Sequence, residues 1–245
     1  MNQPLGRLIV IDAIDGAGKS TAIRAMCAHL ESEGKRVFDL VGYMQREHTL
    51  PPHDLPDLVA ADVLISAEPT HAWIGSAIRE EVISAKHGRS YDGFTAAQAF
   101  SLDRQILFSR VILPFLEARP GRFVIQDRGL ISSLAYQPLQ DARITLPWLL
   151  SLPGNVLELS RPPELLLLLR LAPEEAMKRL GARTDKVDGH VYEIPSFQEQ
   201  LALRYRDTSV LQPYRDAGTH ILEIDASNAP EQVGADCVQA LRVLY

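Results

Sequence analysis

Cysteine, long apolar runs and excess positive charge are all scarce in this chain of 245 residues. Its two cysteines, Cys27 and Cys237, are too few for a disulfide framework, and each falls on the apolar stripe of a predicted helix. The longest apolar run, residues 165–169, is far too short to span a bilayer, and the first residues lack the basic and apolar regions of a secretory signal. We therefore expect a cytoplasmic protein with no membrane partner.

The balance of charge argues against one further class of partner. The chain has 31 acidic and 25 basic residues, a net charge of −6 at pH 7. A polynucleotide would favour a basic face, so we expect no polynucleotide partner, whereas a small phosphorylated ligand needs only a few local cations.

The histidines lack metal-ligand spacing, and we interpret four of them as solvated loop residues, namely His48, His53, His71 and His190.

Short apolar segments alternate with helical patterns along the chain. Strands are predicted at residues 8–11, 37–41, 63–65, 123–125, 165–171 and 220–224. The main predicted helices cover residues 23–30, 73–86, 95–116, 173–182, 196–211 and 233–244. This alternation indicates βαβ units and hence a parallel sheet with helices on both faces. With 46% hydrophobic residues the chain can bury a large core, so we expect one α/β domain over residues 1–245 with a five-stranded sheet.

Two segments interrupt this alternation. Residues 44–62 contain three prolines among mixed polar residues, and we expect a long loop inserted into the domain. Residues 183–193 are polar and lack periodicity, which predicts a short lid. Arg179 and Arg183 lie four residues apart beside it. Cations there either complement a helix C-terminus or neutralise a phosphoryl group in transfer.

A Gly-rich turn joins the first predicted strand to the first predicted helix. It reads Ala13-x-x-x-x-Gly18-Lys19-Ser20, a phosphate-binding loop with alanine where glycine usually begins the motif. The backbone N–H groups of such a loop surround phosphates, and the helix N-terminus adds positive charge. Lys19 would reach the terminal phosphates, and the Ser20 hydroxyl would ligate magnesium. The predicted ATP contacts are Gly16, Ala17, Gly18, Lys19, Ser20 and Thr21.

Polar residues also follow the predicted strand at 123–125. Ligands of parallel sheets gather at the carboxyl ends of strands, so Asp127 would hold a magnesium-bound water and Arg128 would bridge two phosphates. Phe100 and Arg104 share a helix face that suits a nucleobase, although the same pair is equally typical of a core edge. Hydroxyl, ring and amide groups come soon after Arg128, at Ser132, Ser133, Tyr136 and Gln137.

Together these motifs resemble the thymidylate kinase family. The matching segments are DGAGKST at 15–21, EPT at 68–70, IG at 74–75, IR at 78–79, FSLDR at 100–104, DR at 127–128 and SSLAYQ at 132–137. The resemblance continues through residues 179 and 183 to 224–227 and leaves out only 44–62. It implies a three-layer P-loop NTPase fold and transfer of the γ-phosphate of ATP to dTMP. It also implies magnesium as cofactor and a homodimer.

The resemblance implies a role for each matching residue. Asp15 would contact the acceptor sugar, Phe100 would stack on its base, and Arg128 would meet the acceptor phosphate. The rest of the acceptor pocket would be Glu68, Arg104, Ser132, Tyr136 and Gln137. Gly16 matches the subtype whose catalytic arginines come from the lid. The catalytic set would then be Lys19, Arg128, Arg179 and Arg183, with Ser20 and Asp127 at the metal.

Three positions depart from the family pattern. Ala67 stands where an arginine usually precedes Glu-Pro and grips the acceptor phosphate, Gly129 stands where tyrosine usually follows Asp-Arg, and Arg170 replaces a frequent aspartate. Losing one charged hydrogen bond costs about 1.5–3 kcal/mol, or about ten- to a hundred-fold in affinity. We hypothesise that Arg46, on the 44–62 segment, supplies the missing cation.

Two other functions stay open. Ala67 would also suit a kinase for an uncharged acceptor, such as a deoxynucleoside or another small metabolite. That reaction would need Asp15 or Glu68 as a general base. The third possibility is a non-catalytic ATP-binding module whose lid motion signals to a partner. The joint presence of Lys19, Ser20, Asp127 and Arg128 argues against it.

Overall fold

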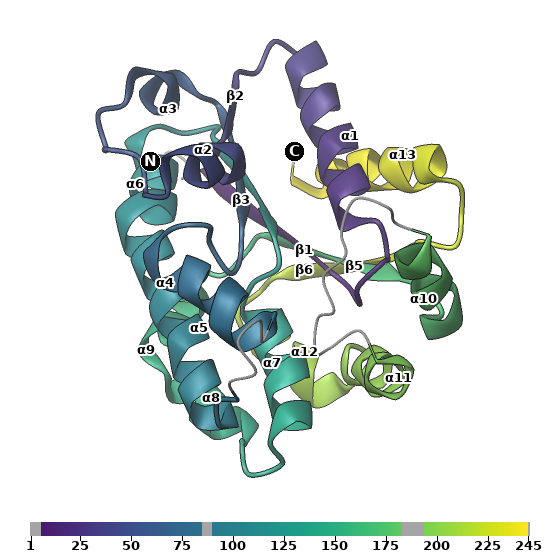
Figure 1. The fold of residues 1–245 in the computed structure, drawn as a ribbon. Helices are drawn as coiled ribbons and strands as arrows, with labels where there is room; N and C mark the ends of the chain where they lie inside the picture. The colour runs from purple at the N-terminus through teal and green to yellow at the C-terminus, as the bar shows by residue number, and fades with distance from the viewer. Residues whose placement is uncertain (1–5, 85–89, 183–193, 245) are drawn as a thin grey trace.

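Six parallel strands form a single sheet in the computed structural model, which describes residues 6–84, 90–182 and 194–244 (Figure 1). The order across the sheet is β2-β3-β4-β1-β5-β6. The strands are β1 (Arg7–Asp12), β2 (Val37–Asp39), β3 (Val63–Ala67), β4 (Phe123–Asp127), β5 (Leu165–Arg170) and β6 (His220–Asp225). The predicted α/β fold is confirmed, with six strands instead of five, because every predicted strand segment enters the sheet.

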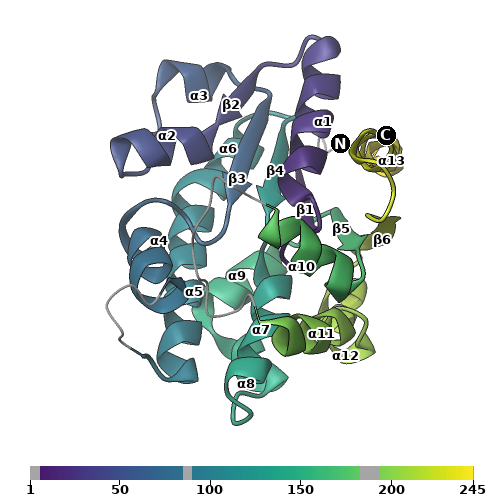
Figure 2. The same ribbon diagram turned by 45° about the vertical axis from the view of Figure 1, so that its right-hand side comes forward.

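Helices cover both faces of the sheet (Figures 1 and 2). The helices on one face include α1 (Lys19–Ser32) and α13 (Pro230–Ala240), which pack against each other, and the other face holds α5 (Gly93–Leu107) with its partner α9 (Pro153–Ser160). The remaining helices are α2 (Leu40–Glu47), α3 (Pro56–Ala60), α4 (Trp73–Ala77), α6 (Leu113–Ala118), α7 (Leu130–Gln140), α8 (Leu146–Ser151), α10 (Pro173–Gly181), α11 (Pro195–Arg204) and α12 (Thr208–Asp216). Two π-helical turns, η1 (Ile78–Ile83) and η2 (Phe108–Ile112), extend α4 and α5, and a 3₁₀ turn, η3 (Leu241–Leu244), follows α13.

The central strands are apolar because both of their faces are covered. Leu8, Ile9, Val10 and Ile11 of β1 have no exposed surface, and neither do the first three leucines of β5. Such continuous apolar runs are typical of parallel strands between two helical layers. Cys27 and Cys237 are buried in this core as free thiols, and burial raises the pKa of each to about 12.

The stretch predicted as a long loop, residues 44–62, contains the end of α2 and all of α3. The predicted strand at 37–41 also stops early, because Asp39 accepts a hydrogen bond from the backbone N–H of Gly42 at 2.9 Å and caps α2. Pro56 stands at the first position of α3, where proline is compatible with a helix. The loop prediction was therefore wrong for both helices, because prolines were interpreted as breaks.

The predicted helix at 196–211 is divided into α11 and α12. Asp207 lies between them and accepts a hydrogen bond from the N–H of Ser209 at 2.8 Å, which caps α12.

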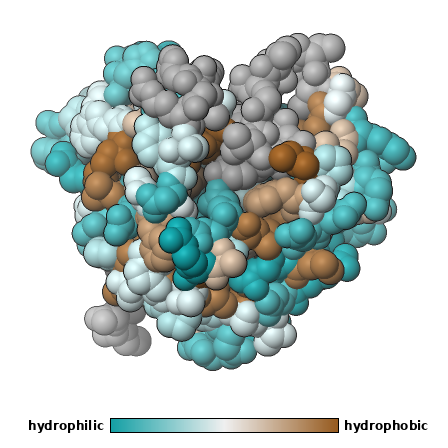
Figure 3. All heavy atoms as spheres, turned by 60° about the horizontal axis from the view of Figure 1, so that its bottom comes forward, coloured by the Kyte–Doolittle hydropathy of each residue, from teal (hydrophilic) through white to brown (hydrophobic). Residues whose placement is uncertain are grey.

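None of the helices in the described ranges is long and apolar enough to cross a membrane. On the face seen in Figure 3, hydrophobic residues are interspersed among hydrophilic ones.

Gly154 sets how closely α9 packs against α5, the helix that carries Phe100 and Arg104. A Cβ at residue 154 would lie 1.8 Å from the carbonyl oxygen of Ser101, well inside van der Waals contact. The N–H of Gly154 donates to Ser101 Oγ at 3.0 Å. Only glycine lets the two helices approach this closely.

We predict that Gly154→Ala lowers the free energy of unfolding by about 2–3 kcal/mol or more, because the added methyl group forces α5 and α9 apart. Urea unfolding monitored by circular dichroism measures the change. The matched control is Gly181→Ala, where a Cβ meets no atom of the described residues within 4 Å. That variant should keep its stability or gain up to about 1 kcal/mol. Equal stabilities for the two variants would contradict the prediction.

Candidate active site

A cleft of about 540 Å³ opens where β1, β3 and β4 end. The register brings these ends together, because Asp127 of β4 pairs with Ile11 of β1 on one side and with Ala67 of β3 on the other. All eight residues predicted for the acceptor pocket line this cleft, namely Asp15, Glu68, Phe100, Arg104, Arg128, Ser132, Tyr136 and Gln137. The cleft lies where parallel sheets usually bind ligands.

The Gly-rich loop forms part of the cleft wall. Gly16 and Gly18 have φ values of 82° and 93°, which glycine adopts without strain. Gly18 precedes α1 and has no side chain to cap it; the N–H groups of Thr21 and Ala22 donate to the Gly18 carbonyl oxygen at 3.0 and 3.1 Å, and no capping side chain competes with a ligand for the N–H groups before them. Gly16, Gly18, Lys19 and Ser20 line the cleft, whereas the predicted ATP contacts Ala17 and Thr21 do not.

Lys19 is a nearly buried cation, with 9% of its surface exposed. Its Nζ donates to the carbonyl oxygen of Ala13 at 3.4 Å. Burial lowers the pKa of Lys19, and Arg128 adds to the effect, although Asp127 and Asp15 oppose it. An anionic ligand in the cleft would therefore stabilise a charge that the fold has removed from water.

Arg128 connects the end of β4 to the Gly-rich loop. Its guanidinium forms ion pairs with Asp12, at 3.3 Å, and with Asp15, and Nη1 donates to Ser132 Oγ at 3.0 Å. The φ of Arg128 is 67°, a left-handed conformation that is uncommon outside glycine. Although burial by itself raises the pKa of Asp15, the charges of Arg128 and Lys19 hold it below its usual value. Asp15 therefore stays ionised at neutral pH.

Two residues that the sequence analysis missed hold the loop from α11 and from the turn after it. Gln198 is fully buried; its Oε1 accepts from the N–H of Asp15 and its Nε2 donates to Asp15 Oδ2, both at 3.3 Å. The Tyr205 hydroxyl donates to Asp12 Oδ1 at 2.7 Å. These residues lie 183 and 193 positions from their partners and outside the quoted motifs, so no local pattern pointed to them.

Asp127 and Ser20 offer oxygen ligands to the cleft. Asp127 Oδ1 is buried and has no hydrogen-bond partner within the described structure. A carboxylate oxygen and a hydroxyl are ligands that magnesium prefers, so the two residues fit this ion. No group of three His, Cys, Asp or Glu residues that would hold a metal occurs in the described ranges. Most ligands of a magnesium ion here would therefore have to come from phosphates and water.

Helices α5 and α7 contribute a ring and an amide to the cleft. Phe100 is partly exposed and lines it. Gln137 also lines it and is only 1% exposed, yet neither Nε2 nor Oε1 has a hydrogen-bond partner among the described residues. Tyr136 donates its hydroxyl to Asp15 Oδ2 at 3.1 Å. Because buried polar groups are nearly always paired, the amide of Gln137 has a donor and an acceptor available for a ligand.

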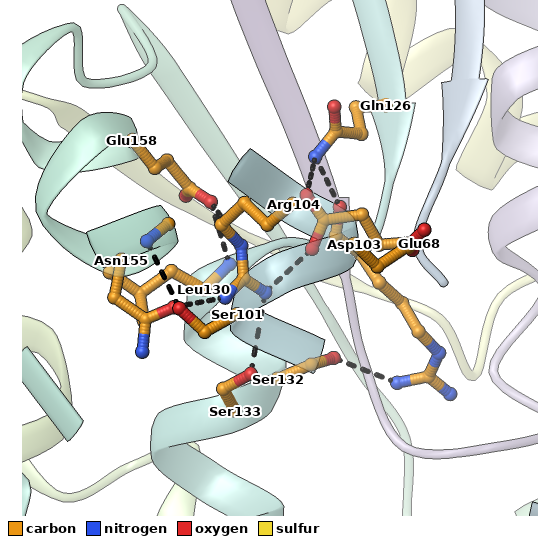
Figure 4. Close-up of polar contacts among 12 residues, drawn as sticks. Glu68, Ser101, Asp103, Arg104, Gln126, Leu130, Ser132, Ser133, Asn155 and Glu158 are labelled. Atoms are coloured by element: carbon orange, nitrogen blue, oxygen red, sulfur yellow. Dashed lines mark hydrogen bonds and ion pairs between the residues drawn. The ribbon is translucent and has the colours of Figure 1, made fainter. Parts of the chain in front are cut away.

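Arg104 lies in a buried polar cluster at the cleft wall (Figure 4). Its guanidinium is held between two carboxylates, with Nη2 2.6 Å from Glu68 and Nε 3.0 Å from Glu158. Two further hydrogen bonds go to Asn155 Oδ1 and Ser133 Oγ. Arg104, predicted to contact the acceptor, therefore uses most of its N–H groups for contacts within the protein and supports the part of the wall that contains Glu68.

Glu158, which the sequence analysis did not identify, lies beside Gly129. A Cβ at residue 129 would stand 3.2 Å from Glu158 Oε1. The same carboxylate accepts hydrogen bonds from the N–H of Leu130 and the hydroxyl of Tyr214, both at 2.9 Å. The missing side chain at 129 thus makes room for an acid that pairs with Arg104.

The structure does not place Arg46 where the missing phosphate clamp would be. Arg46 is exposed on α2 and does not line the cleft, whereas its neighbour Gln45 does and is hydrogen-bonded to His71. The hypothesis that Arg46 replaces the arginine absent at position 67 was therefore wrong. Sequence position alone could not tell which residue of α2 faces the cleft.

Arg179, one of the two arginines predicted for the lid, is not among the cleft residues. Arg179 pairs with Glu175 at 3.3 Å and donates to the carbonyl oxygen of Ala226 at 3.0 Å, which connects α10 to the turn after β6. Arg183 and the predicted lid at 183–193 lie outside the described residues.

Glu68 gives the cluster a pH dependence. Burial raises the pKa of Glu68 from 4.5 to about 8, a shift that Arg104 opposes and Glu158 reinforces. Because the folded state binds this proton more tightly than the unfolded state, the group adds stability below pH 4.5 that is lost as the pH rises toward 8. In the Glu68→Gln variant, the side chain at position 68 has no proton to lose in this pH range. The free energy of unfolding of the wild type should therefore fall relative to that of the variant as pH rises through this window.

Urea unfolding at intervals across this pH window measures the difference. The exposed Glu117→Gln variant is the control, and its stability should follow the wild type at every pH. A constant offset between the wild type and Glu68→Gln over the whole window would contradict the raised pKa.

Comparison with known proteins identifies the family of the chain. Residues 55–237 match the family model described as thymidylate kinase. The thymidylate kinase of Mesoplasma florum is 32% identical over 226 residues, covering 92% of this chain and 90% of that protein. The thymidylate kinase of Cereibacter sphaeroides is 31% identical over 244 residues (96% and 94%), and the probable thymidylate kinase of Thermococcus gammatolerans is 28% identical over 239 (96% and 95%). The chain belongs to the thymidylate kinase family.

Proposed function

We propose that the chain transfers the γ-phosphoryl group of ATP to the phosphate of dTMP across this cleft. ATP would bind the loop at Gly16–Ser20, and dTMP would bind beside Phe100 and Gln137. The observation that carries the proposal is the buried, unpaired amide of Gln137 in the same cleft as the phosphate loop. Its donor and acceptor complement the C4 carbonyl and N3–H of thymine, and Phe100 offers a ring to stack on the base.

No side chain has to act as a strong base in this reaction, because a phosphate oxygen of the acceptor is already nucleophilic at neutral pH. Catalysis would consist of alignment and charge neutralisation. Lys19 would hold the transferring phosphoryl group, and Arg128 would bridge donor and acceptor phosphates. Arg179, on α10, and Arg183, from the lid, would add positive charge.

Asp15 and its neighbours would orient the acceptor sugar. Arg128, Tyr136 and Gln198 all bind the Asp15 carboxylate, so its position is fixed before the acceptor arrives. Ionised Asp15 is a hydrogen-bond acceptor for a sugar hydroxyl. Ser132 would complete this side of the pocket.

We also propose that the cofactor is magnesium, held by Ser20 and, partly through water, by Asp127. Bound there, the ion would neutralise phosphate charge. The unpaired Oδ1 of Asp127 supports this assignment.

Residues 1–245 would form one domain, in a cytoplasmic homodimer. Leu102 of α5 and Val156 of α9 are 45% and 50% exposed on two helices that pack together, which favours this face for the contact between subunits. Sedimentation of the full chain tests the dimer.

One observation favours a kinase for an uncharged acceptor as the second candidate. Glu68 lines the cleft, and its raised pKa would suit a general base. The acceptor phosphate of dTMP needs no such base, so the two functions differ in their acceptors.

We predict that dTMP is phosphorylated faster than dUMP and that thymidine is not phosphorylated. An assay that couples ADP release to a colour change compares the three acceptors at equal concentrations. Preference for thymidine would establish the second candidate, and absence of turnover with every nucleotide would support a non-catalytic ATP-binding module.

We further predict that Gln137→Leu raises the KM for dTMP about ten- to a hundred-fold, because the base loses two hydrogen bonds. The KM for ATP should not change, since Gln137 is not part of the phosphate loop. The control is Gln98→Leu on the exposed side of α5, which should leave both constants unchanged. Equal increases in the two constants would contradict a role in reading the base.

A further inference from the structure

Four of the cationic side chains that line the cleft differ in how their charge is balanced. They are Lys19, Arg79, Arg104 and Arg128. Arg104 is paired with two glutamates and Arg128 with two aspartates. Lys19 belongs to the nucleotide loop. Arg79 therefore remains as a cation that neither the loop nor an acidic side chain of the described structure uses.

Arg79 is fixed in place by main-chain acceptors. Its Nε donates to the carbonyl oxygen of Thr70 at 3.0 Å, and Nη2 donates to that of Pro69. A guanidinium carries five N–H groups, so both hydrogens of Nη1 and one of Nη2 remain for a ligand. The side chain starts from η1 and is held by the segment after β3, so its orientation does not depend on a bound substrate.

Arg79 lines the same cleft as Lys19, Asp127 and Arg128. Burial lowers the pKa of Arg79 to about 10, with Asp103 and Asp127 opposing the shift and Arg128 adding to it. The group is thus charged at neutral pH, poorly hydrated and near Asp127 and Arg128. A desolvated charge without an acidic partner is costly unless an anion binds to it.

Ala67 explains why a further cation is needed here. It ends β3 directly beside Asp127 and lines the same cleft as Arg79, but where the family pattern has an arginine, alanine has no charge to offer. A phosphate monoester with nearly two negative charges would otherwise face Arg128, whose own charge is balanced by Asp12 and Asp15.

We infer that Arg79 binds the phosphate of the acceptor nucleotide in place of the arginine absent at position 67. This inference rests on the proposed function for the nature of the acceptor. Its fork of free N–H groups matches two phosphate oxygens. The residue thereby distinguishes a nucleoside monophosphate from a nucleoside.

The test compares binding of dTMP and thymidine to the full chain by isothermal titration calorimetry. Arg79→Ala should lower the affinity for dTMP about ten- to a hundred-fold and leave the affinity for thymidine unchanged, because thymidine has no phosphate. Arg79→Lys keeps the charge but loses the forked guanidinium. Its affinity for dTMP should lie between those of the wild type and Arg79→Ala. Arg46→Ala, which removes an exposed arginine outside the cleft, is the matched control and should change neither affinity.

If Arg79→Ala lowered the affinities for dTMP and thymidine equally, the inference would be overturned, because Arg79 would then only hold the segment at Pro69 and Thr70. Unchanged dTMP affinity would overturn it as well. The wild type reports separately on the proposed function. If it binds a different nucleoside monophosphate instead of dTMP, the same comparison is made with that monophosphate and its nucleoside.

Discussion

The ion pairs of Arg128 with Asp12 and Asp15 are the constraint on which the site depends. Parallel pairing of β1 and β4 brings their carboxyl ends together, but it does not by itself fix the loop that follows β1. Arg128 does so by reaching from one strand end to the other. Its left-handed backbone costs about 1–3 kcal/mol, which the two carboxylates offset in a buried setting. Without this bridge, the phosphate loop and the acceptor pocket would not keep a common geometry.

The strands and the principal motifs were predictable because their signals are local. Residues 8–11 and 165–171 are continuous apolar runs, and Gly18-Lys19-Ser20 has a meaning wherever a strand precedes it and a helix follows. The end of α2 and all of α3, which lie within 44–62, were missed because such short helical segments lack a full period of apolar residues. Gln198, Tyr205 and Glu158 were missed for another reason. Their partners come from distant parts of the chain, and no spacing encodes such contacts.

Two departures from the family pattern have a physical account in the fold. The methylene and ring atoms absent at Gly129 leave space for Glu158, which pairs with Arg104. Arg79, which lines the same cleft as Ala67, is the cation that we infer takes the place of the charge absent there. In both cases the change at one strand end is matched by a side chain from a helix that packs nearby, so each substitution has to be considered together with its partner. Removing only one member of a buried ion pair such as Arg104–Glu158 strongly destabilises the protein, because the other charge is left unpaired.

Gly16 has an evolutionary consequence. A Cβ at this position would lie 2.6 Å from the carbonyl oxygen of Ala176 in α10, and its φ of 82° is already unfavourable for other residues. An ancestor or descendant of this chain could not acquire an arginine here by one substitution, because α10 would first have to move away. A change of Gly16 to a larger residue therefore requires a repositioned helix as well as a changed codon.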